Sequence, residues 1–501
     1  MRRLAIILPL LFPLAACAQV PEQAQRAAAH AVEHYDDDQV EVLAQLVTFR
    51  TVAEEGVPNW ENPEFRRFAA YVKDRAEEYG LDFTDLGAIL VVGLGDSEDR
   101  LGIVTHGDVQ PADPSKWRKS PFELDSESEP GKLIARGTED DKAPIATALQ
   151  ALRTLKELKL PLKRRVELII SLTEESDWEP FREVLTRWDP PQLNVAIDSD
   201  YPVVVAEKGW GGVWVEFAPV ADANASLPRV ERLQGGAFIS QVPEDALIEI
   251  VNADAAMVKR IRERIAKAGN DVRYHLEESQ DRITITAKGK AAHSASPQHG
   301  INAIAHAAAL LEGEKLADTA GGRAIDFINT LVGTGVYGEK FGNAAYRHHF
   351  MGPLTLNLST AKSQDGGVEL AINTRAPAGK TAAELESDMR AAITGWAQGR
   401  GHASPEVRVQ MSEPHYPERP AHIAPLLAVF KHYTGQHDAE PISIGGGTNA
   451  RLLPNGVNFG PSMPGAEYTG HSEHEFITRE QMTLNLRMYT AMMTWLGMHA
   501  E

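Results

Sequence analysis

The chain of 501 residues contains a single cysteine, Cys17, so no disulfide can form within it. Positive charge is also scarce, because 50 lysines and arginines stand against 70 aspartates and glutamates, for a formal net charge of −20. This balance argues against binding to nucleic acid or to an anionic membrane surface, both of which attract basic proteins. The fold must rest on packing and on any metal that the chain binds.

Long hydrophobic runs are missing after the N-terminus, and no later segment is long and apolar enough to span a bilayer. The start, MRRLAIILPLLFPLAAC, places two arginines before a short apolar stretch and small residues. This pattern predicts a secretory signal peptide over residues 1–18 and export to the bacterial periplasm. Its end resembles a lipobox, so we expect Cys17 to be lipidated and to anchor the protein at the outer membrane. Cleavage after Ala18 is the alternative.

Strand-like apolar runs alternate with helical patterns up to residue 207. We predict helices over Glu22–Val47, Pro63–Tyr79 and Ala143–Leu158. We predict strands at four apolar runs, Ala88–Val92, Leu101–Thr105, Val166–Leu172 and Val195–Ile197. This alternation is typical of an α/β domain with parallel strands, in which ligands bind at the carboxyl ends of the strands.

After residue 207 the pattern changes to runs of strands with few helices, which favours a separate α+β unit. Its predicted elements include a helix over Glu244–Ala268 and strands over Arg282–Lys288 and Val368–Thr374. A helix from about Ile423 resumes the first pattern. We therefore expect one domain in two parts, 19–207 and 413–501, interrupted by an inserted domain over 208–412.

Imidazole and carboxylate side chains recur just after the predicted strands and in two polar loops. The candidates are His106, Asp140, Glu175, Asp198 and His471. Imidazole nitrogen and carboxylate oxygen suit divalent metals, and this set suffices for two ions if one carboxylate bridges them. Asp140 would be that bridge, because two cations would offset its repulsion from the adjacent Asp141. Each fragment alone is weak evidence, since paired acids also occur on solvated faces and at helix N-termini.

Eight segments together resemble one enzyme family: THGDVQP, ARGTEDDKAP, LTEESDW, IDSDYP followed by EKG, GKAAHSASPQHGINA, INTRAPAG, IGGGTNARLL and GHSEHE. From about Val40 to the C-terminus the chain is similar to the M20 metallopeptidases, most of all to the PepV-like and Sapep-type dipeptidases. The resemblance implies an α/β, zinc-peptidase-like catalytic domain with a mixed sheet flanked by helices, plus an inserted α+β lid domain. It also implies a monomer with two divalent metal ions, Zn²⁺ first, with Mn²⁺ or Co²⁺ as alternatives.

The resemblance also implies the ligands. His106 and Asp198 would hold one metal, Glu175 and His471 would hold the other, and Asp140 would bridge them beside a cis bond to Asp141. Glu139 would be a bystander.

Three further residues have expected roles in catalysis. Glu174 would act as the general base, taking a proton from the attacking water and giving it to the leaving amine. Asp108 would orient the His106 imidazole. His293, in the inserted domain, would stabilise the oxyanion, although a lone surface histidine is the ordinary alternative.

The inserted domain would also bind the substrate. Arg375 would bind a free carboxylate through two parallel hydrogen bonds, with a surface salt bridge as the alternative. Gly446 and Gly447 would line the substrate pocket with backbone amides. The pair His348-His349 matches no motif of the family.

These observations predict an exported dipeptidase that acts on small peptides with a free C-terminal carboxylate. Deacylation of N-acyl amino acids is the alternative for the same site. A non-catalytic metal- or peptide-binding lipoprotein is disfavoured, because a binding protein needs no base at Glu174. The chain departs from the family at Ala143, where glycine is usual, and at Asp177 and His474. These departures bear on subfamily and substrate, since none is a proposed ligand.

Overall fold

The computed structural model describes residues 19–220, 226–269, 271–279, 281–417 and 420–499. The predicted signal peptide and Cys17 lie outside the described residues. The chain divides into two compact units: the described residues within 19–205, 420–441 and 448–499 form the first, and those within 206–417 and 442–447 form the second. The segment 442–447 thus groups with the second unit, whereas the sequence analysis placed it in the domain part 413–501.

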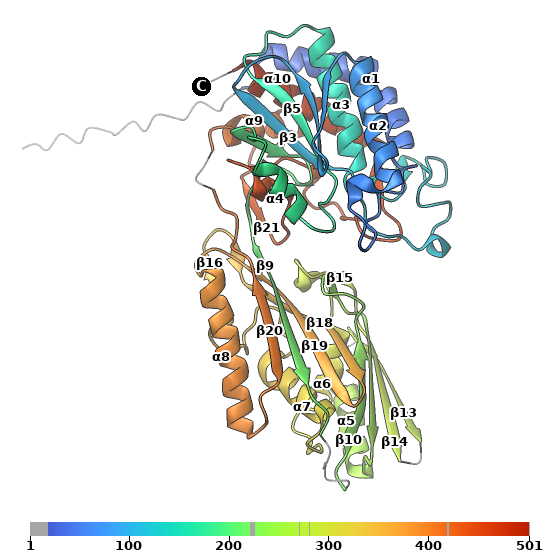
Figure 1. The fold of residues 1–501 in the computed structure, drawn as a ribbon. Helices are drawn as coiled ribbons and strands as arrows, with labels where there is room; N and C mark the ends of the chain where they lie inside the picture. Colours follow the sequence, from blue (N-terminus) through green and yellow to red (C-terminus); the bar gives the residue numbers. More distant parts are fainter. Residues whose placement is uncertain (1–18, 221–225, 270, 280, 418–419, 500–501) are drawn as a thin grey trace, which may run out of the picture. The chain divides into compact units, whose positions relative to one another are not determined.

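A mixed sheet flanked by helices forms the first unit, as expected from the sequence (Figure 1). Its strands follow the order β1-β2-β5-β3-β6-β22-β8. Their bounds are β1 Asp82–Asp85, β2 Ile89–Leu94, β5 Arg165–Ser171, β3 Arg100–His106, β6 Leu193–Ala196, β22 Val457–Asn458 and β8 Val204–Glu207. Four strands at its centre, β5, β3, β6 and β22, are mutually parallel, whereas β1, β2 and β8 pair antiparallel to their neighbours. The prediction of parallel strands therefore holds only for the centre.

Helices lie on both faces of this sheet. Three helices contact one another, α1 (Glu22–Leu46), α3 (Lys142–Glu157) and α10 (Arg479–Met498). Of these, α3 and α10 contact β5, and α3 also contacts β3. On the other face, α4 (Glu179–Leu185) packs Phe181 and Val184 against side chains of β2, β3 and β5. Because both faces are covered, the central strands are buried and mostly apolar, with Glu167 in β5 and Asn194 in β6 as buried polar exceptions.

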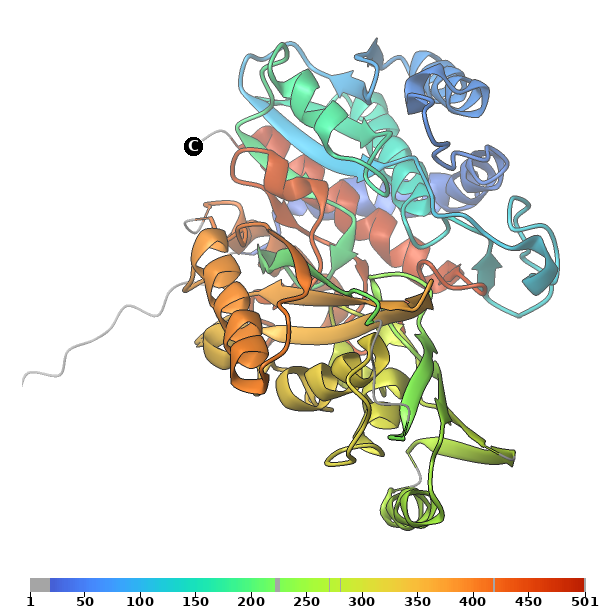
Figure 2. The same cartoon turned by 60° about the horizontal axis from the view of Figure 1, so that its bottom comes forward.

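An antiparallel sheet forms most of the second unit, with strand order β13-β14-β12-β10-β18-β19-β9-β20. The bounds are β13 Arg273–Ser279, β14 Arg282–Lys288, β12 Asp245–Val251, β10 Arg229–Gly235, β18 Thr355–Gln364, β19 Gly367–Ala376, β9 Gly209–Phe217 and β20 Glu406–Met411. Four helices, α5 (Ala255–Lys267), α6 (Ala303–Ala309), α7 (Ala320–Phe327) and α8 (Ala382–Arg400), share one hydrophobic core with this sheet (Figure 2). The expected α+β class is therefore confirmed.

The predicted helix over Glu244–Ala268 is wrong in its first part. Residues Asp245–Val251 form β12, and α5 begins only at Ala255. Every second side chain of this segment, Ala246, Ile248 and Ile250, is buried, and this period of two is that of a strand rather than of a helix. The Asp254 carboxylate then accepts a hydrogen bond from the Met257 amide at 2.7 Å and caps the helix.

None of the helices in the described part of the chain combines the length and the apolar character needed to cross a bilayer.

One histidine couples the stability of the first unit to pH. His422 precedes α9 (Ile423–Thr434) and is only 2% exposed, and burial lowers its pKa from 6.5 to about 4. The unfolded chain therefore binds a proton between these pH values that the folded chain does not. We expect the free energy of unfolding of the metal-free protein to fall by about 2 kcal/mol from this group between pH 7 and pH 5.

The His422→Phe variant removes this effect while keeping a planar ring. Its free energy of unfolding in urea should decrease less between pH 7 and pH 5 than that of the wild type. The same substitution at His437, an exposed histidine, serves as the control. Equal pH dependence in the wild type and His422→Phe would contradict the account.

Candidate active site

The candidate ligands of the first unit gather where its parallel strands end. His106 is the last residue of β3, while Glu174 and Glu175 follow β5 and Asp198 follows β6. The register pairs His106 with Ser171 and Val104 with Ala196, so these strand ends lie side by side at one edge of the sheet. Three parallel strands thus bring together side chains that are far apart in the sequence.

Two loops complete the cluster. Asp140 lies just before α3, and His471 lies in the loop between β23 (Pro461–Ser462) and β24 (Phe476–Thr478). That loop is fixed at both ends, because β23 pairs with β7 (Ser199–Asp200), next to Asp198, and β24 pairs with β4 (Lys132–Ile134). His471 has a φ of 63°, a left-handed conformation that is uncommon for a non-glycine residue and more frequent at functional sites.

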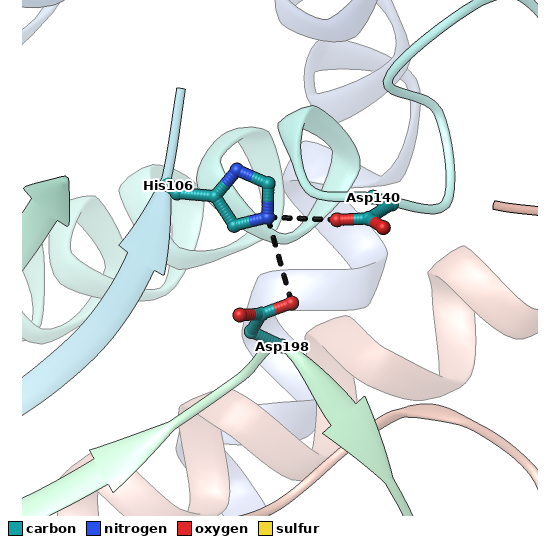
Figure 3. A group of neighbouring side chains, drawn as sticks. All are labelled: His106, Asp140 and Asp198. Carbon is teal, nitrogen blue, oxygen red and sulfur yellow. Dashed lines mark hydrogen bonds and ion pairs between the residues drawn. The ribbon is translucent and has the colours of Figure 1, made fainter. Parts of the chain in front are cut away.

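The two oxygens of Asp140 face two different histidines. Its Oδ1 atom lies 2.7 Å from His106 Nε2, which is also 3.5 Å from Asp198 Oδ1 (Figure 3). Its Oδ2 atom lies 3.1 Å from His471 Nε2, which is 2.9 Å from Glu175 Oε1. Asp140 is thus shared between two groups of possible metal ligands, each with its ligand atoms within 4.8 Å of one another.

The charges of the cluster shift the pKa values of its members. Burial alone would lower the pKa of His106, but the negative charge of Asp198 and hydrogen bonds to the surrounding aspartates raise it well above its ordinary value. Burial would raise the pKa of Asp140, but hydrogen bonds with His106 and His471 hold it well below its ordinary range.

Carboxylates nevertheless outnumber the imidazoles. Burial, followed by the charge of Asp198, raises the pKa of Glu174 well above its ordinary value. Burial also raises the pKa of Asp198 to about 6. Two imidazoles and several nearly buried carboxylates are a donor set that divalent cations prefer, and their charge would offset this repulsion. The residues present therefore fit two divalent metal ions, with His106 and Asp198 for one, Glu175 and His471 for the other, and Asp140 for both.

The peptide bond between Asp140 and Asp141 is cis, as the resemblance implied. Asp141 is fully buried and accepts a hydrogen bond from the Thr105 hydroxyl. Ala143 replaces the glycine that is usual in the family, but it lies within α3 and is not among the residues with positive φ. This position therefore has no need of glycine.

Asp108 positions the two glutamates rather than His106 alone. Its carboxylate accepts the amide hydrogens of Glu174 at 3.0 Å and of Glu175 at 2.9 Å. The closest contact of His106 Nδ1 is the main-chain oxygen of Asp108 at 2.9 Å, and the carboxylate lies 3.5 Å from the same atom. Asp108 therefore links the end of β3 to the loop after β5.

Glu139, expected to be a bystander, organises the loop that carries His471. Its carboxylate accepts hydrogen bonds from the amides of Thr469 and Gly470 at 2.6 and 3.0 Å, and from the hydroxyls of Thr469 and Ser462 at 2.7 and 3.1 Å. In the same loop, the Tyr468 hydroxyl donates to Asp140 Oδ2 at 2.5 Å. The expectation that Glu139 is a bystander is wrong, because its carboxylate accepts four hydrogen bonds from residues near the ligands.

A buried ion pair fixes the main chain of the loop that carries Asp140. Arg136 Nη1 lies 2.7 Å from Glu475 Oε2, and the Glu475 side chain is completely buried. The other oxygen of Glu475 accepts the amide hydrogens of Glu139 and Asp140 at 2.9 and 3.1 Å. Arg136, Tyr468 and Glu475 are functional residues that the motifs alone do not reveal, although all three lie in or beside them.

The remaining candidates lie in the second unit and are described within it. His293 ends β15 (Ala292–His293), is exposed, and accepts a hydrogen bond from the Ala295 amide at its Nδ1 atom, 3.2 Å away. Arg375 lies in β19, is only 6% exposed, and donates from Nε to Asn373 Oδ1 at 3.2 Å. Gly446 and Gly447 follow β21 (Ile442–Ile444) and are partly buried.

Comparisons with known proteins assign the chain to a family. Residues 102–495 match the peptidase family M20/M25/M40. A protein of Staphylococcus saprophyticus that carries a provisional dipeptidase name is 30% identical over 465 residues, which cover 90% of this chain and 95% of the relative. A Bacillus subtilis protein with the same kind of name is 28% identical over 410 residues, 79% of this chain and 82% of the relative.

A solved structure shares the fold. Human carnosine dipeptidase 1 matches with a TM-score of 0.59 and 16% identity, covering 95% of this chain and 99% of that protein. At this identity the likeness supports the fold, and the site must be argued from its own residues.

The Glu475→Gln substitution tests whether the buried ion pair positions the ligands. It keeps the shape of the side chain but removes the charge that pairs with Arg136 and accepts the amides of Glu139 and Asp140. We expect the affinity for Zn²⁺, measured by competition with a chromogenic chelator, to fall by about 10- to 100-fold.

Glu480→Gln is the matched control, because Glu480 is an exposed residue in the first turn of α10, outside the loop that carries His471. Unfolding of both metal-free variants in urea separates a loss of affinity from a loss of folding. Equal Zn²⁺ affinity in the two folded variants would contradict the positioning role.

Proposed function

The chain belongs to peptidase family M20/M25/M40, and on this premise we propose that it is an exported dimetal dipeptidase that hydrolyses small peptides with a free C-terminal carboxylate. The membership confirms the resemblance drawn from the eight motifs, and enzymes of this family depend on two metal ions. The provisional names of the two relatives support dipeptides as the substrate class. The observation that carries the proposal is the placement of the two Asp140 oxygens toward His106 and His471.

Divalent cations, when bound, polarise a carbonyl oxygen and lower the pKa of water. The protein's own residues would do the rest. Glu174 is adjacent to the ligand Glu175, and its main chain is fixed on both sides, by the Asp108 carboxylate at its amide and by Trp178 Nε1 at its carbonyl oxygen, 2.6 Å away. A carboxylate held in this way can take a proton from the attacking water and return it to the leaving amine.

The second unit would supply the substrate contacts. We assign Arg375 to the C-terminal carboxylate, because its guanidinium is held by Asn373 and a guanidinium binds a carboxylate through two parallel hydrogen bonds. We assign His293 to the developing oxyanion, and the amides of Gly446 and Gly447 to the peptide. Because Arg375 lies within β19 and is nearly buried, it differs from an ordinary surface arginine.

The proposal is tested by removing the metal and restoring it. Protein treated with chelator should not cleave dipeptides such as Ala-Gln, and one of Zn²⁺, Mn²⁺ or Co²⁺ should restore cleavage, measured by release of free amino acids. N-acyl amino acids belong in the same panel because they carry the same amide and carboxylate. Faster cleavage of N-acyl amino acids would make the protein a deacylase, and no metal-dependent cleavage of either class would refute the proposal.

A matched pair of variants identifies the base in this assay. Glu174→Gln should keep the metal content and lower kcat by about 10²- to 10⁴-fold, because a carboxamide cannot accept the proton. Asp177→Asn, a change of the same kind at an exposed residue of the same loop, is the control. A Glu174→Gln variant with the activity of the control would remove Glu174 from the mechanism.

Export and a lipid anchor remain part of the proposal, supported by the two arginines, the apolar stretch and the position of Cys17. Mass spectrometry of the mature N-terminus, after expression in a bacterium that processes lipoproteins, tests both. We expect a diacylglyceryl group on an N-terminal Cys17. A mature chain that begins at Gln19 would show cleavage without an anchor, and an intact Met1 would refute export.

A further inference from the structure

Three cations converge in the second unit. Arg375 lies in β19 and Lys208 just before β9, and both are nearly buried, with 6% and 7% of their surface exposed. Arg347 is exposed and belongs to the short strand β16 (Arg347–His348). The segment Gly352–Thr355 connects the three, as its contacts show.

Each of the three cations contacts this segment or pairs with it. Lys208 Nζ donates to the main-chain oxygen of Pro353 at 2.6 Å. Pro353 is paired with Arg347 between β16 and β17 (Gly352–Pro353), and Thr355 is paired with Arg375 between β18 and β19. Lys208 and Arg347 therefore both contact or pair with Pro353, and Arg375 pairs with Thr355, two residues further along the same main chain.

Two of these cations, Lys208 and Arg347, lack a carboxylate partner within the described part of the chain. Burial, followed by the charges of Arg347 and Arg375, lowers the pKa of Lys208 to about 8. Gathering like charges at a nearly buried position is costly, and a bound anion would remove that cost.

Aromatic rings hold the hairpin that carries Arg347. Tyr416 stacks on Phe350, with ring centroids 5.7 Å apart and an angle of 15°, and contacts His348 edge-on at 5.6 Å. The His348 and His349 rings are 4.2 Å apart. The histidine pair that matches no family motif is thus part of a ring cluster beside the cations.

We propose that Lys208 and Arg347 form a second anion subsite beside Arg375, which binds the side-chain carboxylate of an acidic residue at the C-terminus of the substrate. The inference rests on the proposed function, in which Arg375 binds the α-carboxylate. That carboxylate would be bound by Arg375, and Lys208 and Arg347 carry two further positive charges in the same cluster. An aspartate or glutamate at the C-terminus offers the second carboxylate from the same residue.

The test compares two dipeptides that differ only in this charge, Ala-Glu and Ala-Gln, with the metal-loaded protein. We expect kcat/KM to be at least about tenfold higher for Ala-Glu, as a charge-assisted hydrogen bond allows. Equal values for the two peptides would overturn the inference while leaving the dipeptidase proposal intact. Absence of metal-dependent cleavage of both peptides would instead refute the proposed function.

Two variants locate the subsite. In Arg347→Gln and in Lys208→Met, the ratio of kcat/KM for Ala-Glu to that for Ala-Gln should fall toward one. Arg347→Glu should reverse the preference and favour Ala-Lys. Arg273→Gln is the matched control, because Arg273 is an exposed arginine of β13, at the opposite edge of the same sheet.

Urea unfolding confirms that each variant is folded before its ratio is interpreted. A ratio that stays at the wild-type value in the folded Arg347→Gln and Lys208→Met variants would overturn the assignment of these residues. An equal decrease of kcat/KM for both peptides would show that the two cations bind only the α-carboxylate, and it would also overturn the assignment.

Discussion

The sharing of Asp140 between two histidines is the interaction on which the candidate site depends. Its two oxygens contact His106 and His471, and each histidine also meets one further carboxylate, Asp198 or Glu175. A nearly buried carboxylate is stable only when its neighbours offset its charge. Much of the first unit serves this condition: parallel strands supply His106 and Asp198, and β23 and β24 fix the loop of His471.

A second layer of contacts holds these ligands in place. Glu475, paired with Arg136, accepts the amide hydrogens of Glu139 and Asp140, while Asp108 accepts those of Glu174 and Glu175. The carboxylate of Glu139 ties the loop of Thr469 and Gly470 to the same region. In this chain, carboxylates that do not face the metal positions fix the main chain of those that do. Such contacts orient ligands and tune their affinity for metal.

The five ligands could be predicted from the sequence because each lies in a motif and most follow a strand end, where a buried sheet can carry polar groups. Arg136, Tyr468 and Glu475 could not, because their roles arise from contacts across hundreds of residues. For the same reason the sequence does not reveal the contacts of Glu139. The strand Asp245–Val251 is difficult to predict because its short apolar alternation lies directly before a helix and resembles the first turns of that helix. Lys208 and Arg347 come together through the antiparallel pairing of Arg347 with Pro353, and this pairing cannot be predicted from the sequence.

The central claim is that Asp140 is shared by two metal ions, and the number of ions bound per chain tests it most directly. Equilibrium dialysis against Zn²⁺, followed by elemental analysis, should give two ions per wild-type chain. It should give two for Asp177→Asn, and fewer for Asp140→Asn, with weakened binding of both ions. One ion or none in the wild type, or two tightly bound ions in Asp140→Asn, would contradict the account.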